Sequence, residues 1–320
     1  MLDSLTDRLG GHAWTIGPKL RDLTNPAEPP PSIGWHRRVD RLDDRPVHVT
    51  GRYRHRGDSK TLAILVHGLG GCADSGYVLR AARALDELGI ATLRLSMRGA
   101  DRSGEDIYHG GLTDDLTAAL TDPALGGYDR RFVIGFSLGG HIALRTAIDA
   151  ADDRLTAAAA ICSPLDLGAA QRGIDRPSQF VYREYLLREL RDGYRGLAER
   201  GAAPTPAERI AQVRTLREWD ALTVVPRFGF GDVDDYYRRA SVAGDLGELD
   251  RPALLVAARH DPMIGPSAIE SGLSSASSRL TVRWSDRGGH VFFPEKLDLG
   301  FGPRTGLVPQ IMAWFERQTG

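Results

Sequence analysis

The sequence predicts an α/β fold with a mostly parallel, doubly wound sheet and a helical insertion. Short continuous runs of apolar residues, which are typical of strands buried on both faces, alternate with stretches whose apolar residues recur at helical spacing. Because strands alternate with helices, the sheet should be parallel. Between residues 163 and 249 the strand signal disappears while helical spacing continues, which indicates the insertion. At 320 residues the chain is long enough to bury such a core.

The strands and helices of the core are expected where these patterns lie. The apolar runs occupy residues 61–66, 91–97, 131–136, 157–162, 252–258 and 280–284. Helical spacing occurs at residues 78–88, 112–120 and 307–317. Ahead of the main sheet, residues 35–56 alternate loosely between apolar and polar side chains, so we expect an antiparallel strand pair there.

The chain is expected to divide into a core and a cap. The core should comprise residues 1–162 and 250–320, and residues 163–249 should form a helical cap, or lid. Residues 1–34 include the proline-rich run 25–31. Such a run forms a stiff, extended connector, so we expect this N-terminal segment to wrap the domain.

Within the cap, helices are expected at 179–200 and at about 207–219. Residues 226–241 are rich in glycine and aspartate and should be irregular. The cluster Asp232-Val233-Asp234-Asp235 resembles a carboxylate metal site, but it lacks the spacing of a calcium loop. We therefore expect these carboxylates to have a solvated or structural role.

The candidate nucleophile lies in the motif Gly-Phe-Ser-Leu-Gly at 135–139, which joins an expected strand to helix-compatible residues. In a Gly-x-Ser-x-Gly turn of this kind the serine takes a strained conformation, which is tolerable because the flanking glycines lack side chains. The strain lifts the Ser137 hydroxyl above the sheet edge and directs the first N–H groups of the helix, including that of Leu138, toward it. The pentapeptide alone is also compatible with a glycine-rich turn that carries a capping serine.

A serine hydroxyl needs a base, usually a histidine that a carboxylate holds in the right tautomer. Asp261 comes just after the expected strand at 252–258, and His290 follows the next expected strand, at 280–284. Both therefore lie at the carboxyl edge of the sheet, where the functional loops of open α/β sheets gather. We predict Ser137, Asp261 and His290 as a catalytic triad. Asp286 is a competing acid, but it lies closer to the strand that precedes His290 and is expected to cap a turn.

A second glycine-rich stretch, His67-Gly68-Leu69-Gly70-Gly71, follows the strand expected at 61–66. Glycines let backbone N–H groups approach a substrate closely, and an oxyanion hole needs a donor from this part of the fold. We predict the N–H groups of Leu69 and Leu138 as the two donors. A tight turn that needs positive φ is compatible with the same role.

Charge and cysteine content narrow the classes of partner. The formal net charge is −1, so no strong field attracts nucleic acid or an anionic membrane, and a small-molecule partner is favoured. Cys72 and Cys162 lie in different expected elements, which fits a reducing compartment and offers no metal spacing. The first ten residues include Asp3, Asp7 and Arg8 and lack an apolar stretch. We expect a cytoplasmic protein without bound metal or stable membrane anchoring, and the sequence leaves its oligomeric state open.

Taken together, these residues resemble the α/β-hydrolases, whose triad follows the order Ser, Asp, His. More narrowly, the chain is similar to the YheT-type esterase branch, which includes relatives of the abhydrolase-domain phospholipases and the yeast medium-chain acyltransferases. The resemblance covers nearly the whole chain, and its motifs lie at 66–71, 98–99, 107–111, 135–140, 219–220, 226–241 and 288–291. The N-terminal stretch 12–15 departs from the pattern, with Trp14 where glutamine is common. The resemblance implies acyl-ester hydrolysis, sometimes acyl transfer to an alcohol, with no cofactor.

The sequence thus predicts a serine hydrolase for carboxylic esters of short to medium acyl chains. An acyltransferase is the alternative among enzymes, and a non-catalytic binding protein is the alternative from another class. The cap carries more apolar side chains than exposed helices need, so some should line an acyl pocket. The candidates are Phe136, Phe180, Tyr185, Leu186, Phe228 and Phe230. Because the cap helices carry many arginines, we expect no broad apolar face for docking on lipid.

Overall fold

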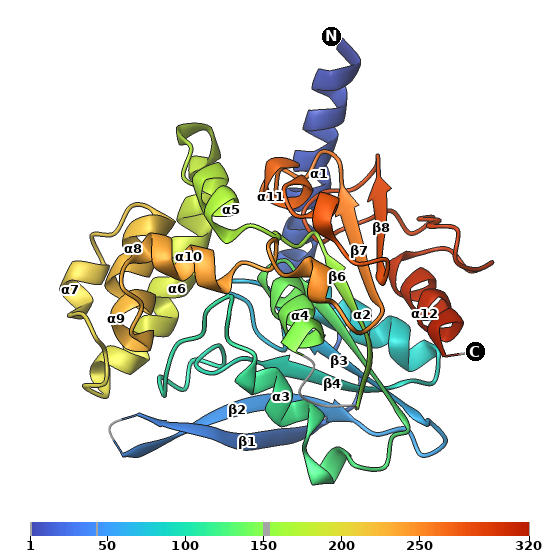
Figure 1. The fold of residues 1–320 in the computed structure, drawn as a ribbon, viewed down its shortest axis with the longest axis horizontal. Helices are drawn as coiled ribbons and strands as arrows, with labels where there is room; N and C mark the ends of the chain where they lie inside the picture. Colours follow the sequence, from blue (N-terminus) through green and yellow to red (C-terminus); the bar gives the residue numbers. More distant parts are fainter. Residues whose placement is uncertain (1, 43, 150–153, 320) are drawn as a thin grey trace.

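The computed structural model describes residues 2–42, 44–149 and 154–319, and its centre is a twisted sheet (Figure 1). Within these residues the sheet has eight strands in the order β1-β2-β4-β3-β5-β6-β7-β8. β2 pairs antiparallel with β1 and with β4, and the other neighbours are parallel. The strands are β1 Ile33–Leu42, β2 Arg45–Arg54, β3 Thr61–Val66, β4 Ala91–Ser96, β5 Arg130–Phe136, β6 Leu155–Ile161, β7 Ala253–Ala258 and β8 Leu280–Ser285. The predicted α/β-hydrolase architecture is confirmed.

The central strands are buried because helices cover both faces of the sheet. In β3, Leu62, Ile64 and Val66 face one core, whereas Ala63 and Leu65 face the other. This is why the strands appear in the sequence as continuous apolar runs rather than as alternating ones. Helices α3 (Asp114–Leu120) and α4 (Leu138–Asp149) cover the first face, and α2 (Gly76–Glu87) and α12 (Leu307–Gln318) cover the second.

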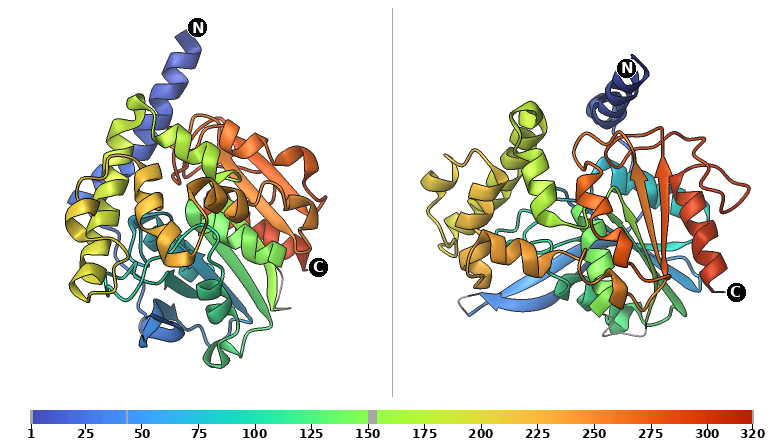
Figure 2. Two further views of the ribbon diagram at one scale, coloured as in Figure 1. Left: turned by 60° about the vertical axis from the view of Figure 1, so that its left-hand side comes forward. Right: turned by 45° about the horizontal axis from the view of Figure 1, so that its top comes forward.

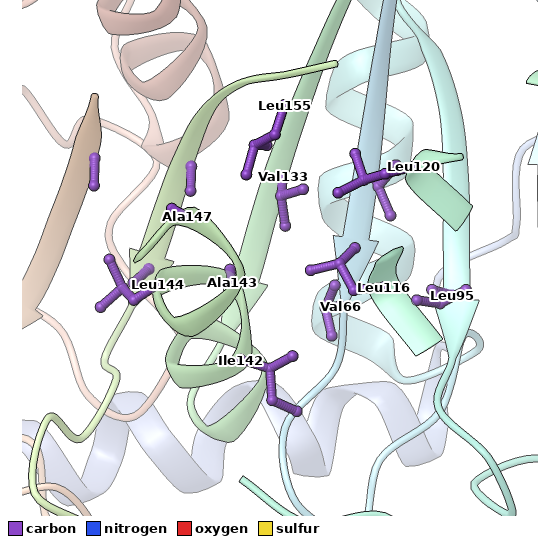
Figure 3. Packing of buried hydrophobic residues seen from close by; sticks show 14 of the residues in the cluster. Val66, Leu95, Leu116, Leu120, Val133, Ile142, Ala143, Leu144, Ala147 and Leu155 are labelled. Atoms are coloured by element: carbon purple, nitrogen blue, oxygen red, sulfur yellow. The ribbon is translucent and has the colours of Figure 1, made fainter. Parts of the chain in front are cut away.

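Helix α4 lies directly over the strands that carry the candidate nucleophile. Figure 3 shows Ile142, Ala143, Leu144 and Ala147 of α4 in one buried cluster with Val133 of β5 and Leu155 of β6. Small and branched side chains let the helix approach the sheet closely, and their burial stabilises the position of the turn between β5 and α4. The start of α4 is therefore fixed by the core.

The insertion between β6 and β7 is helical, as predicted, and stands to one side of the sheet (Figure 2). Its helices are α5 Leu167–Ile174, α6 Phe180–Glu199, α7 Ala207–Ile210, α8 Leu216–Leu222, α9 Val224–Phe228 and α10 Val233–Ala240. Short elements complete the described chain: α11 Ser267–Glu270 and four 3-10 turns at Pro123–Leu125, Pro177–Gln179, Leu246–Glu248 and Leu273–Ser275. A buried cluster that includes Leu187, Tyr194, Leu197 and Trp219 gives the cap a small core of its own.

Two predictions inside the cap were wrong. The single helix expected at about 207–219 is two helices, because Thr215 and Glu218 form a capping box that begins α8 at Leu216. The segment expected to be irregular at 226–241 contains the end of α9 and all of α10. The Asp232 carboxylate starts α10 by accepting the N–H of Asp235 over 2.7 Å, which gives part of the acidic cluster a structural role.

The N-terminal segment contains an element that the sequence analysis missed. Residues Leu2–Thr24 form the helix α1, and the extended connector begins only after it. The N-terminal end of α1 projects beyond the body of the protein, while its other end runs alongside the cap (Figures 1 and 2). None of the helices in the described residues is long and apolar enough to cross a membrane.

Candidate active site

Ser137 sits in the turn between β5 and α4 with a φ of 52°, the left-handed conformation expected at a nucleophile elbow. Close backbone contacts leave no room for a side chain at the glycines on either side of this turn. A Cβ at Gly135 would overlap the carbonyl oxygen of Gly139, and a Cβ at Gly139 would overlap that of His67. The Ser137 N–H donates to Ile161 O of β6 over 2.8 Å, which ties the turn to the sheet. The strain is thus held in place by packing on both sides.

Asp261 and His290 form a buried hydrogen-bonded pair. His290 Nδ1 lies 2.9 Å from Asp261 Oδ2, and Asp261 Oδ1 accepts the N–H groups of Met263 and Ile264 over 2.8 and 3.0 Å. Because the carboxylate binds Nδ1, Nε2 is the nitrogen left to face a substrate. His290 and Ser137 line the same cavity. Within the described residues no hydrogen bond joins the two side chains, and such contacts often tighten only in the substrate complex.

The competing acid, Asp286, lies on the surface. Its side chain is 84% exposed and pairs with Arg259 over 2.8 Å. Asp261, in contrast, is buried and bonded to His290. The geometry therefore favours Asp261 as the residue that orients the histidine.

Among the residues that the structure describes, neither of the two predicted oxyanion donors has a hydrogen-bond partner for its N–H group. Leu138 is the first residue of α4, so its N–H has no partner inside the helix. Leu69 lies in the turn after β3, and in the described part of the chain its N–H makes no hydrogen bond. A Cβ at Gly68 would lie only 3.0 Å from Ser137 Cβ, so this turn passes directly against the elbow. Both N–H groups are therefore available to donate to the carbonyl oxygen of an acyl group that is bound to Ser137 Oγ.

Two tyrosines, which the sequence analysis did not single out, fix the shape of the turn after β3. Tyr77 accepts the Gly68 N–H over 2.9 Å, and Tyr108 accepts the Gly70 N–H over 3.0 Å while donating to Gly68 O over 3.0 Å. Burial raises the pKa of both hydroxyls, so both stay protonated. The motif at 107–111 contains Tyr108, but nothing in the sequence placed its hydroxyl on this turn.

The buried His67 side chain also supports the turn after β3. Burial lowers its pKa to about 4, so the ring is neutral near pH 7. Its Nε2 accepts the Met97 N–H over 3.1 Å, which leaves Nδ1 to donate to Gly68 O over 2.8 Å. The ring is therefore a structural group and not a second base.

A cavity of about 610 Å³ opens beside Ser137 and is lined mainly by apolar side chains. Tyr185 and Leu186, two of the predicted acyl-pocket residues, belong to its wall, together with Leu138, Leu167, Ile174, Leu216, Trp219 and Val224. The volume is within the range of pockets that hold small organic ligands. The walls come from the core, from the cap and from α1.

The other four predicted pocket residues are not part of the wall of this cavity, and the prediction is corrected for them. Phe136 is buried in the core cluster on the α2 and α12 face of the sheet, and Phe180 is exposed at the first turn of α6. Phe228 and Phe230 pack around the His109 ring, with ring centroids 4.4 and 5.5 Å from it. The apolar character of these residues alone did not distinguish a side chain that lines the cavity from one that packs elsewhere in the protein.

Helix α1 packs on the loops that carry Asp261 and His290. The Thr15 hydroxyl accepts the His290 N–H over 2.8 Å and donates to Gly11 O. A Cβ at Gly11 would overlap His260 O, and a Cβ at Gly289 would overlap Gly11 O and the Thr15 hydroxyl. These small residues let the helix lie against both loops.

The same helix contacts the cap. His12 Nδ1 and the Tyr182 hydroxyl lie 2.6 Å apart, and Lys19 Nζ lies 3.1 Å from the centre of the Tyr185 ring. Burial of its ammonium group lowers the pKa of Lys19 to about 8, although Glu189 opposes the shift. Helices α1 and α6 therefore run side by side along the cavity.

One group of donor atoms could in principle hold a metal. Within the described residues, ligand atoms of Cys162, Asp261 and His290 lie within 4.8 Å of one another. Burial, reinforced by the Asp261 carboxylate, raises the pKa of the Cys162 thiol well above its usual range, so the thiolate that a metal prefers is disfavoured. Asp261 and His290 also bind each other directly. We assign no metal to this group.

Comparison with known proteins decides the family. Residues 63–297 match the family model described as alpha/beta hydrolase fold. This chain is an α/β-hydrolase. YheT of Escherichia coli (strain K12) is 30% identical over 266 residues, which cover 80% of this chain and 74% of that protein. The α/β-hydrolase therefore belongs with the YheT-like relatives that its motifs indicated.

Other relatives of this α/β-hydrolase come from Saccharomyces cerevisiae. Monoacylglycerol lipase is 26% identical over 247 residues, and medium-chain fatty acid ethyl ester synthase/esterase 2 is 25% identical over 265 residues. Each alignment covers 73% of this chain, but only 55% and 58% of the respective yeast protein. Among solved structures, Pyrococcus furiosus esterase Pf2001 superposes with a TM-score of 0.52 at 16% identity, over 82% of this chain and 91% of that chain. That likeness supports the fold.

Proposed function

We propose that this α/β-hydrolase is a serine carboxylesterase that cleaves esters of short to medium acyl chains through an acyl-enzyme. One observation carries the proposal. Ser137 at a strained elbow and His290, which is hydrogen-bonded to Asp261, line one apolar cavity. Relatives that are named as a lipase and as a synthase/esterase support the choice of an ester as the substrate.

In the proposed reaction, Ser137 Oγ attacks the acyl carbonyl carbon while His290 Nε2 takes the hydroxyl proton. The carbonyl oxygen becomes an oxyanion, which the N–H groups of Leu69 and Leu138 stabilise. His290 then returns the proton to the departing alkoxide, and the alcohol leaves. Water, deprotonated by the same histidine, attacks the acyl carbon. The bond from that carbon to Ser137 Oγ then breaks, His290 returns the proton to Oγ, and the acid leaves. Asp261 keeps His290 in the tautomer that both steps require.

Because the cavity wall is mainly apolar, we propose that the cavity binds the acyl group of the substrate. Each buried methylene contributes about 0.8 kcal/mol, or about a fourfold gain in kcat/KM. The rise with chain length should end when the cavity is full. We propose that the cap acts as a lid that excludes water from the acyl-enzyme.

A cytoplasmic location stays a prediction from the sequence.

The test combines covalent labelling with turnover. A fluorophosphonate should add to Ser137 of the folded protein, and the adduct should be absent in Ser137→Ala when intact mass is measured. Hydrolysis of p-nitrophenyl esters of increasing chain length should show an optimum at short to medium length. No adduct and no turnover with a correctly folded protein would favour a non-catalytic binding protein. If an added alcohol captures the acyl group faster than water does, the protein is an acyltransferase.

A further inference from the structure

Exposed apolar side chains gather on α1 and at the first turn of α6, two helices that border the cavity. Among the residues whose side chains the structure describes, six large apolar side chains are exposed, and five of them belong to α1 and to the first turn of α6. These five form what we call the apolar rim: Leu9, Ile16, Leu20, Phe180 and Val181. A gathering of this kind on one part of a surface indicates an interaction site.

The α1 part of the rim is one face of the helix. Leu9, Ile16 and Leu20 are spaced by seven and four residues, so they lie along one side. The opposite face of the helix already packs on the protein, because Gly11 and Thr15 contact the loops of the candidate active site. The apolar face of α1 is therefore left without a partner in the described chain.

The rim continues into the cavity. Ile16, Leu20 and Val181 are exposed and also belong to the cavity wall that includes Ser137. The N-terminal end of α1 and the turn into α6 project from the same side of the molecule (Figures 1 and 2). The three shared residues offer an acyl chain apolar contacts between the rim and the cavity.

Two arginines flank the α6 part of the rim. Arg183 donates to the backbone carbonyls of Asp175 and Arg176 over 2.8 and 3.2 Å. In the described part of the chain, neither Arg176 nor Arg183 has a carboxylate within ion-pair distance, so no ion pair offsets these two side chains beside the exposed apolar residues. Apolar groups with adjacent cations suit an interface where acyl chains meet anionic headgroups.

We propose that the apolar rim docks reversibly on a lipid surface with anionic headgroups. Such docking would let amphipathic acyl esters pass from the lipid layer into the cavity, and this delivery step rests on the proposed function. A second copy of the chain fits less well, because it would cover the cavity mouth and bring arginines of its own to the same face. The sequence predicted no stable membrane anchoring for the chain and no broad apolar face on the cap helices. The docking proposed here is reversible, and most of the rim lies on α1.

Co-sedimentation with vesicles tests the docking without any need for catalysis. Wild-type protein should sediment with phosphatidylcholine vesicles that contain about 30 mol % phosphatidylglycerol, and less with phosphatidylcholine alone. The double variant Leu9→Ser/Phe180→Ser should lower the partition coefficient about 10-fold or more. Ile33→Ser is the matched control, because Ile33 is 65% exposed, close to the 59% of Phe180, and lies in β1. Its partition coefficient should stay unchanged.

Charge and catalysis are tested in parallel. Arg176→Glu should weaken binding to the anionic vesicles about fivefold or more, whereas Arg209→Glu on α7 should not. The double variant Leu9→Ser/Phe180→Ser should hydrolyse a soluble p-nitrophenyl ester as fast as the wild type. Vesicle binding without ester hydrolysis would support the docking surface and contradict the proposed function.

Three results would overturn the docking proposal. The first is no sedimentation of the wild type with either vesicle. The second is an equal loss of binding in Ile33→Ser, which would show that any exposed apolar side chain suffices. The third is a stable dimer in light scattering that Leu9→Ser/Phe180→Ser dissociates, because the rim would then be an interface between copies of the chain.

Discussion

The Thr15 hydroxyl of α1 accepts the backbone N–H of His290 over 2.8 Å, between residues 275 positions apart in the chain. A buried N–H is costly to leave without an acceptor. The contact therefore links the N-terminal helix to the loop that carries the proposed general base, and it makes α1 part of the candidate active site.

Thr15→Val keeps the shape of the side chain but removes this acceptor. We expect kcat for a soluble ester to fall about 10-fold with little change in KM, because His290 is displaced while the acyl wall is kept. Thr15→Ser keeps the hydroxyl and should restore kcat. The rate of fluorophosphonate labelling of Ser137 should follow kcat. Equal effects of valine and serine would show that only packing matters at this position.

Asp261→Asn tests the choice of acid. The amide favours the wrong tautomer of His290, so kcat should fall by roughly 10²–10⁴ while the fold is kept. Asp286→Asn is the matched control, because that carboxylate is exposed and paired with Arg259. Steady-state kinetics and circular dichroism of both variants give the answer. If Asp286→Asn is the damaging change, the acid has been assigned wrongly.

Tyr108→Phe tests the support of the oxyanion turn. Without the hydroxyl, the Gly70 N–H loses its acceptor and the turn that presents Leu69 can shift. We expect kcat to fall about 10- to 100-fold, more than KM changes, because the oxyanion forms only during the reaction. Tyr53→Phe removes a hydroxyl that bonds to Tyr128 in another part of the protein and should leave kcat unchanged. An unchanged kcat in Tyr108→Phe would contradict the proposed role of this tyrosine.

Asp220 makes stability depend on pH. It lines the cavity, burial raises its pKa to about 7, and the Tyr237 hydroxyl donates to it over 2.6 Å. Between about pH 4 and pH 7 the folded chain thus binds a proton that the unfolded chain has lost, so the contribution of Asp220 to stability falls as the pH rises through this window.

Asp220→Asn should therefore raise the free energy of unfolding, relative to the wild type, by about 1–3 kcal/mol more at pH 8 than at pH 5. Urea unfolding at the two pH values measures this difference. The amide keeps an oxygen that can accept from Tyr237, so the comparison isolates the charge. A difference that does not depend on pH would show that Asp220 does not titrate in this range.

The sequence by itself determined the structural features that depend on residues close together in the chain. The strands of the sheet were predictable because burial on both faces demands continuous apolar runs, as in β3 and β7. The elbow was predictable because its strain is local: Gly135 and Gly139 are needed by atoms within a few positions of Ser137 or at the end of the adjacent β3. The places of Asp261 and His290 followed from strand order, since the ends of parallel strands meet at one edge.

Only the tertiary structure decided which distant residues meet at the cavity. Phe180 and Tyr185 lie on the same helix and are similarly apolar, yet one is exposed and the other lines the cavity, because the rotation of α6 against α1 and the core selects the face. The hydroxyls of Thr15 and Tyr108 find their acceptors and donors only after α1 and the loop at 107–111 have packed. Such contacts depend on how elements far apart in the chain pack together, and no local pattern of residues encodes that packing.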